Sequence, residues 1–254
     1  MTAFLASFRN EWHKLMRRKK YIVFLCIGAG FCIAWAALGH LASTAIRQQS
    51  GGGILLALTP TPMGALPFFL QIMIPLLIFM GAADLITVEG TDGAMRAALC
   101  SPVERWKLYA SKLAAIITYA AMYLACIFVT ASLLNLLFGR PIRASAFFID
   151  ILAYALTLVP LAVLVCFAAL AALLCRSGTM AMFLLMLAYL ALNILPMFFP
   201  LLNELLFTSF LGWHRAWAGV LPRASRLIHM LAILLGYGMA FFAAGSLLFD
   251  RKEY

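Results

Sequence analysis

The chain has 254 residues, of which 65% are hydrophobic and only 11% are charged, and its mean hydropathy is +1.01. A soluble domain contains about 45–50% apolar and about 25% charged residues, so this composition excludes a water-soluble globular protein. The formal net charge is +10, from 19 Lys and Arg against 9 Asp and Glu. In a membrane protein this excess indicates which side of the bilayer each loop occupies, and it is no evidence of nucleic-acid binding.

Six stretches of the chain contain no charged residue, and they predict six transmembrane helices. They cover residues 21–41, 66–83, 113–138, 151–174, 177–203 and 227–249. A spanning helix needs about 20 apolar residues at a rise of 1.5 Å per residue, so each stretch can cross once. A cleaved signal peptide is the alternative for the first stretch, but no small-residue cleavage site follows it. The predicted fold is an all-α polytopic membrane protein with one transmembrane domain over residues 1–254.

Lys and Arg are divided unevenly between the two sides of these predicted spans. The N-terminus, the second and fourth loops and the C-terminus carry 13 of them, and the opposite segments carry 6. By the positive-inside rule, both termini are predicted to be cytoplasmic. On the opposite side, residues 204–226 are too apolar for a free loop, which predicts a segment that dips into the membrane or lies along its face.

The first twenty residues predict an amphipathic helix at the membrane surface. Large apolar side chains recur every three or four residues, as expected for one helical stripe. They are Phe4, Phe8, Trp12 and Leu15 or Met16. Arg17 and Arg18 fall mainly on the other side, where cations can contact anionic headgroups. The alternative is an ordinary solvated N-terminus that only sets topology.

The loop between the second and third spans, residues 86–105, is the most informative segment. Gly90 and Gly93 are predicted to break the exit from the second span. Residues 94–99 have good helix propensity for about two turns, and the residue before Pro102 must leave the helical region. This pattern predicts a short helix across the cytoplasmic ends of two spans, suited to docking another protein. A plain connecting loop is the alternative.

This segment resembles the cytoplasmic loop of the type-2 ATP-binding-cassette (ABC) exporter permeases of bacteria. The matching positions are Glu89, Gly93, Leu99, Pro102, Val103, Arg105 and Lys112. Ala94 departs from the pattern, because the family usually has Thr at this position. Residues 8–15 resemble the family's N-terminal interface helix, and residues 249–252 resemble its usual C-terminus, so the resemblance covers the whole chain.

The resemblance implies that the loop is a coupling helix seated in a cleft of a separate ATPase subunit. The residues assigned to this ATPase interface are Glu89, Gly93, Arg96, Leu99, Pro102, Val103, Arg105 and Lys112. A working unit of two permease chains and two ATPases is implied, as a homodimer or heterodimer of permeases in the bacterial plasma membrane. It also implies that residues 204–226 form a re-entrant hairpin.

The motifs of several enzyme classes are missing from the chain. It has no phosphate-binding G-x-x-x-x-G-K-[ST] loop, no H-E-x-x-H and no G-x-S-x-G, so we expect no enzymatic activity of its own. ATP and magnesium are expected on the partner ATPase. The six cysteines and four histidines lack metal-ligand spacing, so no cofactor or metal is expected.

Inside the predicted spans the polar residues are few and uncharged. Gln71, Asn135 and Asn193 are interpreted as interhelical hydrogen-bonding groups, with substrate contact as the alternative. The absence of a charged residue near mid-membrane weighs against an ion-coupled carrier. The sequence therefore predicts an ABC exporter permease with a small or lipophilic cargo, such as a drug, peptide antibiotic or lipid. An ATPase-independent carrier or channel is the first alternative, and a membrane-embedded enzyme is the second.

Overall fold

The computed structural model describes residues 2–47, 62–93, 95, 104–137, 144–214 and 224–252, and every regular element in them is helical. Six helices in these ranges are long and apolar enough to cross a membrane, which confirms the all-α polytopic fold. Five spans are single helices, and four of them are α2 (Lys19–Arg47), α7 (Arg105–Leu137), α8 (Ala144–Leu174) and α11 (Ala224–Arg251). The fifth span is α9 (Gly178–Phe198).

The second span is built from five consecutive helical segments, two of which are π-helical. They are α3 (Pro62–Phe68), η2 (Phe69–Met73), α4 (Ile74–Ala82), η3 (Ala83–Val88) and α5 (Glu89–Thr91), with η2 and η3 the π segments. The span continues eight residues beyond the charge-free stretch, because acidic side chains at its end do not interrupt a helix. The helix therefore passes Gly90 and ends at Thr91, two residues before Gly93, whose φ of 76° is in the left-handed region that favours glycine.

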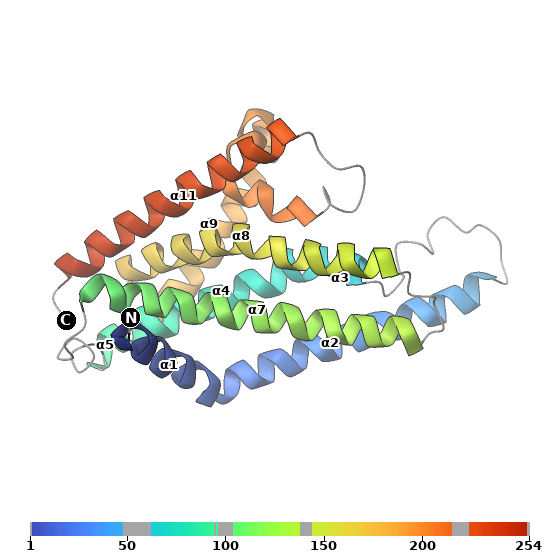
Figure 1. The fold of residues 1–254 in the computed structure, drawn as a ribbon, viewed down its shortest axis with the longest axis horizontal. Coiled ribbons are helices and arrows are strands. Elements are labelled where there is room, and N and C mark those ends of the chain that lie inside the picture. Colours follow the sequence, from blue (N-terminus) through green and yellow to red (C-terminus); the bar gives the residue numbers. More distant parts are fainter. Residues whose placement is uncertain are drawn as a thin grey trace.

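The two ends of the chain lie at the same end of the bundle (Figure 1). An N-terminal helix, α1 (Thr2–Arg17), precedes the first span and packs against α7. The third span also packs against α2 and α8, and α8 packs in turn against α9 and α11. By contrast, α9 and α11 leave many large apolar side chains exposed, as expected for helices that face lipid.

Small and aromatic residues set the close contacts between the spans. Gly28 of α2 lies so near α7 that a Cβ atom there would be 2.4 Å from the Tyr123 hydroxyl. The rings of Tyr21 and Tyr119 meet edge to face at 5.1 Å, again between α2 and α7. Aromatic pairs of this geometry add to the energy of burial, so these two spans form a fixed pair.

Proline residues in the second and fifth spans remove backbone donors that other side chains replace. Pro75 lacks the N–H that would bond the Gln71 carbonyl in an α-helix, and the Tyr189 hydroxyl donates to that carbonyl at 3.2 Å. In the same way Pro196 cannot bond the Leu192 carbonyl, which accepts a hydrogen bond from Thr208 at 3.5 Å. Hydroxyl groups thus join the kinked positions to neighbouring elements.

The segment after the fifth span folds back onto the bundle. Phe199 leaves the helical region before Pro200, and two short 3-10 helices follow, η4 (Pro200–Glu204) and η5 (Phe207–Trp213). Several side chains of η5 are buried, and η5 packs against α8, α9 and α11. Its apolar composition is therefore explained by burial in protein. Residues 215–223 lie outside the described residues, so a re-entrant path for 204–226 stays a prediction.

Candidate functional site

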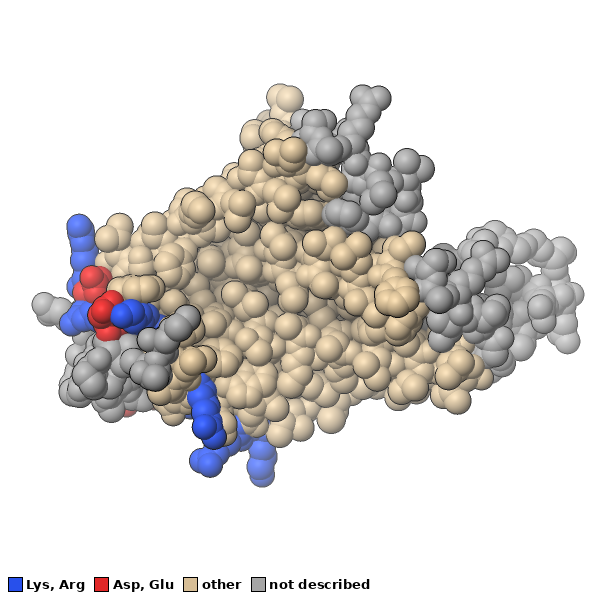
Figure 2. Space-filling view, viewed as in Figure 1, with Lys and Arg blue, Asp and Glu red and all other residues tan. Residues whose placement is uncertain are grey.

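Charged side chains gather at and near the end of the bundle that holds both termini (Figure 2). The face shown over the middle of the spans carries none. Because the hydrocarbon core of a bilayer excludes unpaired charge, this end marks a membrane–water boundary. The loop that the sequence predicts to contact an ATPase is expected at the same boundary, so the charged groups here are the first candidates for a functional site.

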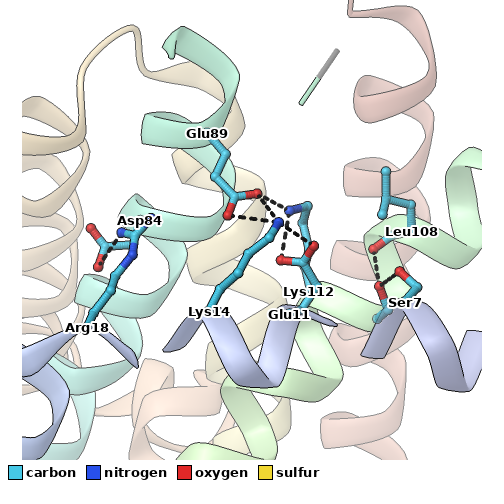
Figure 3. Close-up of polar contacts among 9 residues, drawn as sticks. Ser7, Glu11, Lys14, Arg18, Asp84, Glu89, Leu108 and Lys112 are labelled. Atoms are coloured by element: carbon cyan, nitrogen blue, oxygen red, sulfur yellow. Dashed lines mark hydrogen bonds and ion pairs between the residues drawn. The ribbon is translucent and has the colours of Figure 1, made fainter. Parts of the chain in front are cut away.

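One side of α1 carries a polar stripe that points at the bundle (Figure 3). Its members are Ser7, Glu11 and Lys14, and Arg18 continues it one residue beyond the end of α1; the steps of four, three and four residues are the spacing of one helical face. Ser7 hydroxyl lies 2.8 Å from the hydroxyl of Ser111 on α7. This polar stripe runs beside the apolar stripe of α1 and faces the other helices of the bundle.

Four of the charged residues form one buried network between α1, α5 and α7. The Lys112 ammonium lies 2.5 Å from Glu89 and 3.1 Å from Glu11. Lys14 lies 2.8 Å from Glu11 and 3.2 Å from Glu89. Lys112, Glu11 and Glu89 are 0%, 1% and 3% exposed. Two carboxylates and two ammonium groups balance, which is the condition under which buried charges are tolerated.

Two opposing effects act on the pKa of Lys14, namely its burial and its two carboxylate partners. Burial alone lowers the pKa of this ammonium, but the hydrogen bonds and charges of Glu11 and Glu89 outweigh it. The pKa of Lys14 therefore lies above its ordinary value. Because that value is already far above neutrality, Lys14 stays charged at neutral pH.

A second cluster surrounds Asp84 at the bend between α1 and α2. Arg18 and Lys20 lie 3.3 and 2.5 Å from this carboxylate, and the Tyr21 hydroxyl donates to it at 2.7 Å. The Tyr119 hydroxyl in turn donates to the Tyr21 carbonyl at 2.6 Å. Asp84 thus attaches the start of the first span to the second, with the third span held through Tyr119.

The π-helical segment η3 places both acidic residues on the same side of the second span. In an α-helix Asp84 and Glu89, five residues apart, would be separated by about 140° around the axis. A π-helix closes its hydrogen bonds between residues i and i+5, so residues five apart come close to one face. This geometry lets Lys14 of α1 and Arg18, which directly follows α1, bind the two carboxylates.

Two contacts join the C-terminus to the same end of the bundle. Arg105 donates to the Asp250 carbonyl in the last turn of α11 at 2.7 Å. Lys252 donates to the Leu173 carbonyl in the last turn of α8 at 2.7 Å. Cations suit these positions, because the last carbonyls of a helix lack backbone donors and carry partial negative charge. The C-terminal residues therefore link α7, α8 and α11.

The structure places the predicted ATPase-interface residues in three different situations. Glu89 and Lys112 are buried and paired with each other. Gly93 forms the turn that ends the second span, and Arg105 is exposed at the start of α7. The remaining residues, Arg96, Leu99, Pro102 and Val103, lie outside the described residues, as does most of the predicted helix at 94–99. Contact with an ATPase stays a prediction for all of them.

The predicted membrane-surface residues are also divided. Phe4, Phe8 and Trp12 are partly buried, and the last two pack against the protein core, as does the fully buried Leu15. Arg17 is exposed, whereas Arg18 binds Asp84. The apolar stripe is thus shared with the protein, and contact with lipid stays a prediction.

Sequence reasoning missed the network partners on α1. Glu11, Lys14 and Asp84 are not among the site residues that the sequence predicts. The signal that was available is the stripe of Glu11, Lys14 and Arg18 at helical spacing, opposite two acids at the end of an apolar run. Among the described residues no cluster of His, Cys, Asp or Glu is placed to hold a metal.

Comparison with known proteins decides the family. A sequence profile described as ABC-2 family transporter protein matches residues 7–193, about three quarters of the chain. The chain belongs to the ABC-2 transporter family. No curated protein matches it at significant similarity. Membership makes the chain a multi-pass permease subunit of an ABC transporter, and an ABC ATPase is the general partner of such subunits.

Proposed function

We propose that this ABC-2 permease is the membrane subunit of an ATP-driven exporter and that residues 86–105 transmit the movement of the ATPase to the spans. The observation that carries the proposal is the buried network of Lys112 with Glu89 and Glu11. It lies at the base of this loop, since Glu89 precedes the Gly93 turn by four residues. A force on the loop therefore acts first on Glu89.

The network joins three elements so that they move together. Removing one partner of a buried ion pair costs about 3–5 kcal/mol. Separating these charges is therefore unfavourable, and the joined helices move as one unit when the loop is displaced. Movement of the loop is then passed to α1 and α7, and through α7 to the spans packed against it. In this mechanism Glu89 and Lys112 are positioning residues. Arg96, Leu99, Pro102 and Val103 are the proposed contacts with the ATPase.

The proposal includes orientation and assembly. The 13 cations on the side of the termini against 6 on the other support cytoplasmic termini in a bacterial plasma membrane. Two permease chains would form the substrate path, with ATP and magnesium held by two ATPase subunits. A small or lipophilic cargo fits a chain whose predicted outer segments are too short for a separate domain.

The proposal is tested with the permease and its ABC ATPase reconstituted together in liposomes. We expect Glu89→Gln to keep the ATPase bound during co-purification but to reduce permease-stimulated ATP hydrolysis at least about fivefold, because the loop no longer drives α1 and α7. Arg105→Ala should weaken co-purification itself. These two results separate coupling from docking.

Glu104→Gln is the matched control, since the partners of Glu104 among the described residues are its surface neighbours Lys107 and Trp106. It removes the same charge at the edge of the same loop and should behave as the wild type, because exposed ion pairs contribute little. Wild-type association and wild-type stimulation in both Glu89→Gln and Arg105→Ala would exclude the proposed coupling role.

A further inference from the structure

A polar cavity lies toward the opposite end of the second span from the charged network. Gln71 at its wall precedes Glu89 by eighteen residues, which is about 27 Å of helix at 1.5 Å per residue. The cavity has a volume of about 400 Å³ and is enclosed by α3, η2, α9 and the segment η4–η5. It therefore lies toward the end of the bundle away from the termini.

The wall of this cavity is unusual for a membrane interior because hydrogen-bonding groups face one another across it. Amide, hydroxyl and imidazole groups contribute, from Gln71, Asn193, Asn203, Thr208, Ser209 and His214. The rest of the wall is largely apolar and includes Leu70 and Met197. No Lys, Arg, Asp or Glu is among the described residues that line it.

Two of these polar groups bond to the backbone of α9, and Gln71 is the group that an occupant would meet. Asn193 donates through its amide to the Tyr189 carbonyl at 2.8 Å, and Thr208 donates to the Leu192 carbonyl. Gln71 is exposed on the span. An amide left without hydrogen bonds in hydrocarbon costs several kcal/mol, so this position is favourable only when water or a ligand fills the cavity.

We propose that the cavity binds an amphipathic molecule with an uncharged hydrogen-bonding head group and an apolar tail. The amides and hydroxyls match the head group, and Leu70 and Met197 match the tail. The volume is within the range of about 300–1,000 Å³ that is usual for small-molecule sites. That this molecule is a transported cargo rests on the proposed transport function. Binding itself does not depend on the ATPase.

The test uses the purified permease in phosphatidylcholine nanodiscs without its ATPase. A diazirine-bearing monoacylglycerol, which has an uncharged diol head, is photolysed beside the protein, and the adducts are mapped by mass spectrometry. A diazirine-bearing fatty acid with the same tail is the comparison probe. We expect the monoacylglycerol to label residues 193–214 at least about fivefold more than the fatty acid does.

Two volume-conserving variants and one control connect the labelling to the cavity. Gln71→Met and Asn193→Leu should each reduce it at least about fivefold, whereas Asn135→Leu, the same change in α7, should leave it unchanged. Size-exclusion profiles and helical circular dichroism verify that each variant is folded. Equal labelling in all variants, or labelling spread evenly along the exposed faces of α9 and α11, would overturn the proposal.

Competition identifies the source of the ligand. Dioleoylglycerol placed in the nanodisc competes if the site is filled from the bilayer, and octyl glucoside added to the buffer competes if it is filled from water. Either result supports a saturable site, and labelling that neither compound reduces would overturn it. Because no ATPase is present, failure here leaves the proposed coupling untouched, and failure of the coupling experiment leaves this cavity untouched.

Discussion

Lys112 is the residue on which the charged network depends most. It is fully buried, and its ammonium contacts the carboxylates of both Glu89 and Glu11. From the sequence it was predicted to contact an ATPase through a family pattern, and its position at the edge of an apolar run gave no sign of burial. The reason is physical: its partner Glu11 is 101 residues away, and no local periodicity encodes a pairing over that distance.

Replacing Lys112 by Met should destabilise the folded permease strongly. Two buried carboxylates would then share only Lys14, and the loss of one partner of a buried ion pair costs about 3–5 kcal/mol. Thermal unfolding in detergent should show a clear fall in Tm. Lys107→Met is the control, because Lys107 pairs with an exposed carboxylate and its loss should change Tm little.

A second substitution identifies the cause of that loss. Adding Glu11→Gln to Lys112→Met removes one of the uncompensated charges, so the double variant should be more stable than Lys112→Met alone. Strictly additive losses would mean that Lys112 and Glu11 do not interact in the folded protein. This outcome would contradict the network.

At the scale of the helices, the sequence predicted the number of spans because apolar length alone decides whether a segment can cross a bilayer. It did not predict the two π-helical segments. These arise in a span with Pro75 in its middle and with acids at its end that bind another helix. A π-helical segment depends on what the helix packs against more than on the local sequence, so it is seen only in the three-dimensional structure.

Gly28 and Gly30 of α2 offer a matched test of helix packing. A Cβ atom at position 28 would lie 2.4 Å from the Tyr123 hydroxyl, whereas nothing lies within 4 Å of one at position 30. We expect Gly28→Ala to lower stability by about 1–3 kcal/mol through overpacking. Gly30→Ala should be neutral or slightly stabilising, because alanine favours the helix. Equal Tm values for the two variants in detergent would contradict the close contact of α2 with α7.

For the whole molecule, composition and charge were sufficient to predict a six-span membrane protein, and the loop motif was sufficient to suggest its family. The candidate site was predicted only in outline. The structure places the charged network at the end of the bundle that holds both termini, where cations and acids cluster in the segments that flank the apolar runs. Which charges are buried in pairs depends on how α1 packs across the bundle.

The predicted orientation can be measured in a variant that lacks the six native cysteines. A membrane-impermeant maleimide should label Ser50→Cys in intact cells, because the segment after the first span is predicted to be outside. It should label Asn10→Cys only after permeabilisation, because the N-terminus is predicted to be cytoplasmic. The reverse pattern would show that the cation excess does not set the topology of this chain.

The polar stripe of α1 has a consequence for biogenesis. Glu11 leaves the ribosome long before its partner Lys112, which follows 101 residues later. At about 5–20 residues per second, this separation corresponds to about 5–20 s of synthesis. During that interval the N-terminal helix holds a carboxylate and several cations without their final partners, and it cannot adopt its native position. α1 therefore reaches its final position only after the start of the third span has emerged, so insertion order and final assembly order differ at this end of the molecule.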